Sequence, residues 1–148
     1  MSVEEDQETK NATFEMQADV NLNDTDAAGI LFFANYFRIA HTAYEAFMKS
    51  IGCGLDHIIR KSNYLLPIVH AEADYKRGLH LGDEFTISLK AQIGQTSFTL
   101  SYLFTDAHGN VAAKLRTVHV SVDKKTGEKI PLPEEIRKGL ATIIPMPF

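Results

Sequence analysis

The sequence predicts an α+β fold in which an antiparallel sheet of about five strands wraps around one long helix. Three observations support this prediction. Apolar residues recur at helical spacing in a single long segment, residues 33–51. Apolar and polar residues alternate with a period of two in one segment before it and in four segments after it. The length of 148 residues fits one domain, which we place at residues 13–148.

The first strand is expected at residues 13–22, because Phe14, Met16, Ala18 and Val20 alternate with polar residues. Residues 23–29 then hold Asn, two Asp, Thr and Gly, a composition typical of a loop. The first strand therefore leads through a polar loop into the helical segment.

The helix prediction rests on a wide apolar stripe. Its residues recur at spacings of three and four and are Phe33, Tyr36, Phe37, Ala40, Ala43, Tyr44, Phe47, Met48 and Ile51. Gly52 and Gly54 supply the stop signal. A helix of about five turns that is this apolar has to be buried by other elements.

Four further strands are expected at residues 67–76, 85–93, 98–104 and 111–122, following one another as a meander. Pro133, Glu134 and Glu135 open a short C-terminal helix, with the acidic residues at its positive end. The sequence contains no internal repeat and no linker.

Composition excludes several classes of function. The net charge of −4 and pI near 5.8 give no electrostatic footprint for nucleic acid. Part of the acidic excess lies in residues 1–12, which we expect to form a disordered tail. Cys53 is the only cysteine, and neither a secretory signal nor a membrane-length apolar run is present. We therefore expect a cytoplasmic protein that binds neither membranes nor nucleic acid.

Common catalytic and cofactor motifs are missing from the sequence. It has no G-x-S-x-G elbow, no P-loop and no G-x-G-x-x-G. The six histidines show no metal-ligand spacing, so we expect no metal site and no cofactor.

The join between the first strand and the helix remains as the candidate site. Asp24 and Asp26 lie there in a loop of small residues, just before a helix whose first turn exposes free N–H groups. Such amides can hold an oxyanion, and a nearby carboxylate can attack a thioester or activate water. On spacing alone, Asp-x-Asp before a helix is more often a turn and a cap, with Gly29 easing the turn.

The residues themselves favour the catalytic interpretation. The stretch DTDAAGILFFANYFRIAHTAYEAFM resembles the hallmark segment of the 4-hydroxybenzoyl-CoA thioesterase-like branch of the hotdog proteins. Within this branch it is most similar to the 1,4-dihydroxy-2-naphthoyl-CoA hydrolases of quinone biosynthesis. A weaker resemblance continues through PIVHAEADYKRGLHLGD and the strands around Phe98 and His119.

The resemblance implies a hotdog fold and a set of site residues. It makes Asp26 the catalytic acid, acting as nucleophile or general base, and Asp24 the structural member of the pair. It places the thioester carbonyl against the backbone N–H near Phe33, where some relatives carry His. Thr96 and Ser97 fall where related thioesterases contact CoA, and His70 is a candidate for the acyl pocket or for an interface. Lys76 and Arg77 could meet the CoA phosphates, but their sequence context favours a solvated turn.

The resemblance also implies an assembly and a reaction. Two copies would join their sheets in a homodimer, with a homotetramer expected, and the substrate would be an aromatic acyl-CoA, first of all 1,4-dihydroxy-2-naphthoyl-CoA. The alternatives are a broader thioesterase for fatty or phenylacyl groups and a non-catalytic protein that binds acyl thioesters.

Overall fold

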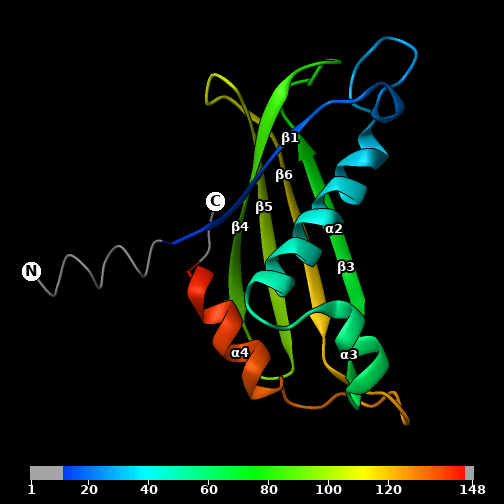
Figure 1. Cartoon of the computed structure of the whole chain (residues 1–148), viewed down its shortest axis with the longest axis vertical. Helices are drawn as coiled ribbons and strands as arrows, with labels where there is room; N and C mark the ends of the chain where they lie inside the picture. Colours follow the sequence, from blue (N-terminus) through cyan, green and yellow to red (C-terminus); the bar gives the residue numbers. More distant parts are fainter. Residues whose placement is uncertain (1–11, 146–148) are drawn as a thin grey trace, which may run out of the picture.

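The computed structural model describes residues 12–145. Apart from Ala12, the tail expected over residues 1–12 lies outside them. Five antiparallel strands form the main sheet in the order β1-β4-β5-β6-β3 (Figure 1). Their bounds are Phe14–Asp19 for β1, Ile68–Tyr75 for β3, Glu84–Ile93 for β4, Ser97–Asp106 for β5 and Val111–Val120 for β6.

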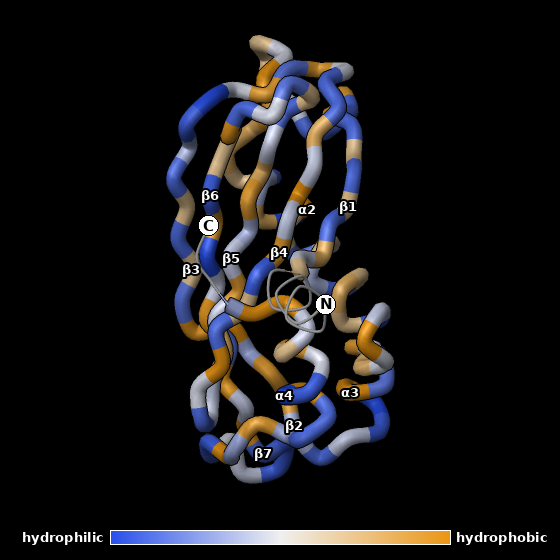
Figure 2. The backbone as a smooth tube through the Cα atoms, turned by 90° about the vertical axis from the view of Figure 1, so that its left-hand side faces the viewer, coloured by the Kyte–Doolittle hydropathy of each residue, from blue (hydrophilic) through white to orange (hydrophobic). Residues whose placement is uncertain are grey.

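The long helix α2, Phe33–Ser50, packs along one face of this sheet. Figure 2 looks onto the sheet with α2 behind it. Tyr36, Ala43 and Phe47 of α2 are buried, as are Leu89 and Phe104 of the sheet. Fully burying a side chain such as that of Phe47 stabilises the fold by about 1.5–3 kcal/mol. The apolar stripe of the helix and the inner face of the sheet therefore form one core.

Shorter elements gather at the end of the sheet opposite the start of α2 (Figure 1). They are α3, Leu55–Lys61, the two-residue strands β2, Tyr64–Leu65, and β7, Val122–Asp123, and the helix α4, Glu134–Leu140, followed by the 3-10 turn η2, Ala141–Ile143. Residues 12–145 include no helix with the length and hydropathy needed to cross a membrane.

The structure confirms the expected α+β arrangement and the expected helix. Two details of the prediction were wrong. Strand β3 pairs with β6 and not with its successor β4, so only β4, β5 and β6 form a meander. Phe33 was predicted to lie in the buried stripe but is 60% exposed, because it begins the helix at the end of the sheet.

The position of β3 leaves it as an edge strand. Within residues 12–145 its outer side has no neighbouring strand, and seven of its eight residues are exposed. These include apolar side chains, with Val69 58% and Tyr75 45% exposed. An edge that presents both unpaired backbone groups and apolar surface is suited to pairing with another strand.

Candidate active site at the start of α2

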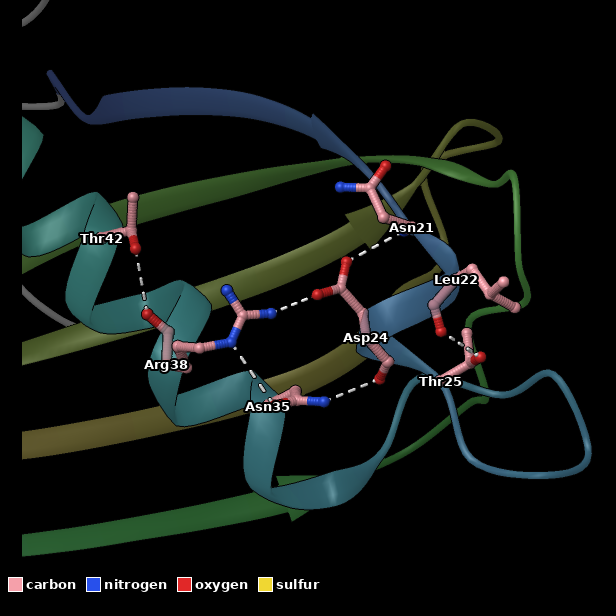
Figure 3. A network of polar contacts seen from close by, with 7 residues as sticks. All are labelled: Asn21, Leu22, Asp24, Thr25, Asn35, Arg38 and Thr42. Atoms are coloured by element: carbon pink, nitrogen blue, oxygen red, sulfur yellow. Dashed lines mark hydrogen bonds and ion pairs between the residues drawn. The ribbon is translucent and has the colours of Figure 1, made fainter.

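Asp24 anchors the loop that leads into α2 (Figure 3). It ends the 3-10 turn η1, Leu22–Asp24, and is only 4% exposed. Its carboxylate accepts a hydrogen bond from the backbone N–H of Asn21 at 2.9 Å and pairs with the guanidinium of Arg38. Its carbonyl oxygen accepts hydrogen bonds from the Asn35 amide at 2.8 Å and the Phe32 N–H at 3.0 Å. Asp24 thus ties η1 to the first turns of the helix.

Asp26 lies two residues further along, on the exposed side of the loop. Its Oδ1 accepts hydrogen bonds from the backbone N–H groups of Ala28 at 2.8 Å and Ile30 at 3.2 Å. Gly29 has a φ of 76°, which lets the chain turn back so that these amides face the carboxylate. Among residues 12–145 no group donates a hydrogen bond to Oδ2 of Asp26. One oxygen therefore fixes the orientation of the carboxylate, and the other is available to a substrate.

The start of α2 has free backbone donors. The N-cap residue Phe32 makes no side-chain capping bond, and the first turn holds no acidic residue. Within the described part of the chain, neither the N–H of Phe33 nor that of Ala34 has a hydrogen-bond acceptor. The positive end of the helix dipole adds to the attraction for a developing negative charge.

Asp26 and Phe33 line the same groove, which has a volume of about 470 Å³. The helix start, the end of β3 and the segment after β3 surround it. The other lining residues are Ile30, Leu31, Phe32, Tyr36, Tyr75, Lys76, Arg77 and Gly78. The groove thus combines a carboxylate, free amides, aromatic walls and two cationic side chains, which is a set that suits a thioester with a phosphorylated tail.

Two tyrosines in the groove were not identified from the sequence as site residues. The hydroxyl of Tyr75 donates a hydrogen bond to the Phe33 carbonyl at 2.9 Å, and the ring of Tyr36 lies 5.1 Å from that of Tyr75. Burial raises the pKa of both phenols, so both stay protonated at neutral pH. Alternation along the strand could not have identified Tyr75, because it carries no information on which part of the helix the strand meets.

The remaining predicted site residues lie elsewhere in the single chain. Thr96 ends the β4–β5 turn and Ser97 begins β5, where it pairs with Val120 at the end of the sheet away from Asp26. His70 lies on β3 with its side chain 57% exposed, and its Nε2 is 3.5 Å from a carboxylate oxygen of Glu72. One chain does not bring these residues to the groove.

The groove brings a carboxylate and free helix amides together. Residues 12–145 contain no cluster of three or more His, Cys, Asp or Glu that could hold a metal ion. A carbonyl oxygen placed on the amides of Phe33 and Ala34 would present its carbon to the region of Asp26. This arrangement can support attack by the carboxylate or by a water that it activates.

Comparisons with known proteins show which family this chain resembles. The profile of the thioesterase-like superfamily matches residues 20–140. A 1,4-dihydroxy-2-naphthoyl-CoA hydrolase from Rippkaea orientalis is 37% identical over 124 residues, which cover 82% of this chain and 90% of that protein. The crystal structure of a 1,4-dihydroxy-2-naphthoyl-CoA thioesterase from Synechocystis superposes with a TM-score of 0.82 at 30% identity, covering 87% and 96% of the two chains. The gentisyl-coenzyme A thioesterase BH1999 gives a TM-score of 0.76 at 27% identity, covering 86% of this chain and 99% of that one.

Proposed function

We propose that this chain, which belongs to the thioesterase-like superfamily, hydrolyses an aromatic acyl-CoA to the free acid and CoA. The first-choice substrate is 1,4-dihydroxy-2-naphthoyl-CoA. The observation that carries the proposal is the groove in which Asp26 and the free amides of Phe33 and Ala34 meet. The hotdog fold and the relatives with the same activity support it.

In the proposed reaction, the thioester carbonyl oxygen accepts hydrogen bonds from the N–H groups of Phe33 and Ala34. Asp26 then acts in one of two ways. As a general base, it takes a proton from a water whose oxygen bonds to the carbonyl carbon, and the C–S bond breaks as CoA leaves with that proton. As a nucleophile, it forms a mixed anhydride and releases CoA, and water then hydrolyses the anhydride.

Lys76 and Arg77 are proposed to attract the CoA phosphates. Both are exposed at the rim of the groove, and their backbone N–H groups bond to the Ala112 carbonyl at 2.8 and 3.0 Å. The backbone of this segment is therefore held in place while the cationic side chains face solvent. The sequence alone favoured a solvated turn here, and the position of that turn at the groove supports the binding role.

We also propose a homodimer in which two copies pair their β3 strands in antiparallel fashion. The exposed edge of β3 supports this, and so does the placement of Thr96 and Ser97. Those residues lie toward the beginning of β3, whereas Asp26 lies near its end. A two-fold axis across β3 would bring the Thr96 and Ser97 of one copy toward the Asp26 groove of the other, and would put His70 near the interface. A homotetramer would be built from two such dimers.

A panel of acyl-CoA thioesters tests the proposed reaction. Release of free thiol is measured with dihydroxynaphthoyl-, benzoyl- and fatty acyl-CoA at matched concentrations. The proposal predicts the largest kcat/KM for the bicyclic aromatic substrate. Much faster turnover of the aliphatic thioesters would overturn the choice of substrate, and no turnover of any thioester would favour a binding protein.

A further inference from the structure

A second hollow, of about 400 Å³, lies between α2 and the inner face of β3. Apolar side chains, among them Phe37, Ala40 and Ile68, contribute most of its walls. Two hydroxyl-bearing residues, Tyr102 of β5 and Thr117 of β6, line it from the sheet. Both are nearly fully buried, whereas the other two polar lining residues, Arg38 and His41, belong to α2 and are exposed.

These hydroxyls belong to a hydrogen-bonded chain that ends at His119. Oη of Tyr102 lies 3.2 Å from Oγ1 of Thr117, and that atom lies 2.9 Å from Nε2 of His119. Nδ1 of the same ring lies 3.4 Å from the carbonyl oxygen of Leu66. The His119 ring is fully buried and stacks on Phe98 at 4.6 Å.

The direction of each hydrogen bond in this chain can be assigned. A carbonyl oxygen only accepts, so Nδ1 of His119 carries the hydrogen that Leu66 receives. Burial lowers the pKa of His119 to about 4, so the ring is neutral at pH 7 and Nε2 is bare. The Thr117 hydroxyl therefore donates to Nε2. Because the Thr117 hydroxyl uses its only hydrogen in that bond, it can only accept from Tyr102, and the Tyr102 hydroxyl must be the donor.

The consequence is a fixed polarity at the floor of the hollow. Both hydroxyl hydrogens are committed to the internal chain, so Tyr102 and Thr117 have only oxygen lone pairs to offer to a ligand. An acceptor in an apolar site favours a ligand that brings a donor, because a ligand without one leaves the acceptor unpaired. A hydroxyl group on an aromatic ring is such a donor.

The hollow is also at a suitable distance from the proposed point of attack. Phe37 follows Phe33 by one turn of α2, and His41 follows by two, which corresponds to roughly 6 and 12 Å along the helix. His41 is exposed and lines the hollow. A bicyclic acyl group whose carbonyl rests on the Phe33 amide could therefore extend along α2 toward this hollow.

We infer that this hollow holds the acyl ring of the thioester and that Tyr102 and Thr117 select a ring hydroxyl by accepting its hydrogen bond. This inference rests on the proposed thioesterase function and adds the residues that determine specificity within it. Ile68 and Ala71, which line the hollow, lie toward the start of β3, whereas the Asp26 groove lies at its end. Antiparallel β3 pairing in the proposed dimer would therefore also bring the hollow of one copy toward the helix start of the other.

The test compares two substrates that differ only in ring hydroxyls, 1,4-dihydroxy-2-naphthoyl-CoA and 2-naphthoyl-CoA. The unmutated protein should prefer the hydroxylated thioester in kcat/KM by about tenfold or more. Tyr102→Phe and Thr117→Val should remove most of this preference by lowering kcat/KM for the hydroxylated substrate alone. Thr117→Ser keeps the hydroxyl and should keep the preference.

Tyr64→Phe is the matched control, because it also removes a buried tyrosine hydroxyl, one that bonds to Glu135 at 3.0 Å away from the hollow. It should leave the ratio of the two substrates unchanged. If Tyr102→Phe and Thr117→Val lower kcat/KM for both substrates equally, or for neither, the inference is overturned while the thioesterase proposal stands. If the unmutated protein hydrolyses neither aromatic thioester, both proposals fail together.

Discussion

The hydroxyl of Tyr75 donates a hydrogen bond to the carbonyl oxygen of Phe33, 2.9 Å away and 42 residues earlier in the chain. The two rings also meet edge to face, with centroids 6.4 Å apart. The contact ties the end of edge strand β3 to the first turn of α2. The Phe33 carbonyl shares a peptide group with the Ala34 N–H, so a hydrogen bond to this carbonyl also polarises one of the proposed oxyanion donors.

Tyr75→Phe should therefore lower kcat by roughly two- to tenfold, the range expected from the loss of one hydrogen bond. The cause would be a less polarised and less firmly held donor at the helix start. Steady-state thiol-release assays measure the effect. Tyr64→Phe is the control, since it removes a tyrosine hydrogen bond to Glu135 at the other end of the fold and should leave kcat unchanged. Equal kcat values for Tyr75→Phe and the unmutated protein would show that the contact has no catalytic role.

Asp24→Asn should destabilise the protein by about 1–3 kcal/mol. The substitution removes the buried negative charge opposite Arg38. The expected loss of stability is modest because the Arg38 side chain is 55% exposed and solvent weakens the ion pair. Urea denaturation measures the change. Asp26→Asn is the matched variant two residues away, and it should have little effect on stability because the amide oxygen can still accept from Ala28 and Ile30. Equal losses in the two variants would contradict this separation of roles.

Acidification should destabilise the protein through His119. Burial lowers the pKa of His119 from 6.5 to about 4, so the unfolded chain binds a proton there at a higher pH than the folded protein does. The contribution of neutral His119 to the free energy of unfolding is complete above about pH 6.5. It is lost progressively as the pH falls to about 4, and the total loss is about 3 kcal/mol. Denaturation curves between pH 7 and pH 4 measure it. His119→Gln removes the titrating group, so its stability should fall less over this range, and parallel pH profiles would refute the assignment.

Val69→Lys should weaken the proposed dimer. Val69 is 58% exposed on the edge strand β3, and a lysine there places a charge from each copy at the proposed interface. Ile59→Lys is the control, because Ile59 is equally exposed at 57% but belongs to α3. Sedimentation velocity should show monomers at higher concentrations for Val69→Lys than for the control. A dimer that both variants leave intact would place the interface elsewhere.

Local patterns predicted most of the elements of this fold. The helix expected at residues 33–51 is α2, Phe33–Ser50, and each expected strand appears with small shifts at its ends. The sequence missed α3 because Gly52 and Gly54 were interpreted only as the end of the preceding helix. It also missed β2 and β7, since strands of two residues show no alternation. These omissions reflect how little periodicity a short element can carry.

Strand pairing and the assembly of the site depend on long-range contacts that local alternation does not encode. Strand β3 alternates like its neighbours, yet its partner is β6. Its polar outward residues His70, Glu72 and Asp74 were the available sign of an edge strand. Asp26 and Phe33 were placed together by the family resemblance of one continuous segment, whereas Tyr75 reaches the groove only through the tertiary fold. The distance of Thr96 and Ser97 from that groove likewise appears only in the structure.

The catalytic role of Asp26 is decided by the turnover of the Asp26→Asn variant. The substitution keeps the size of the side chain and an oxygen for the loop amides, and it removes the charge that attacks or activates water. We expect kcat for 1,4-dihydroxy-2-naphthoyl-CoA to fall by about 10²–10⁴-fold, while the affinity for CoA, measured by calorimetry, stays unchanged. A variant that binds CoA normally and retains the kcat of the unmutated protein would contradict the assignment of Asp26 as the catalytic residue.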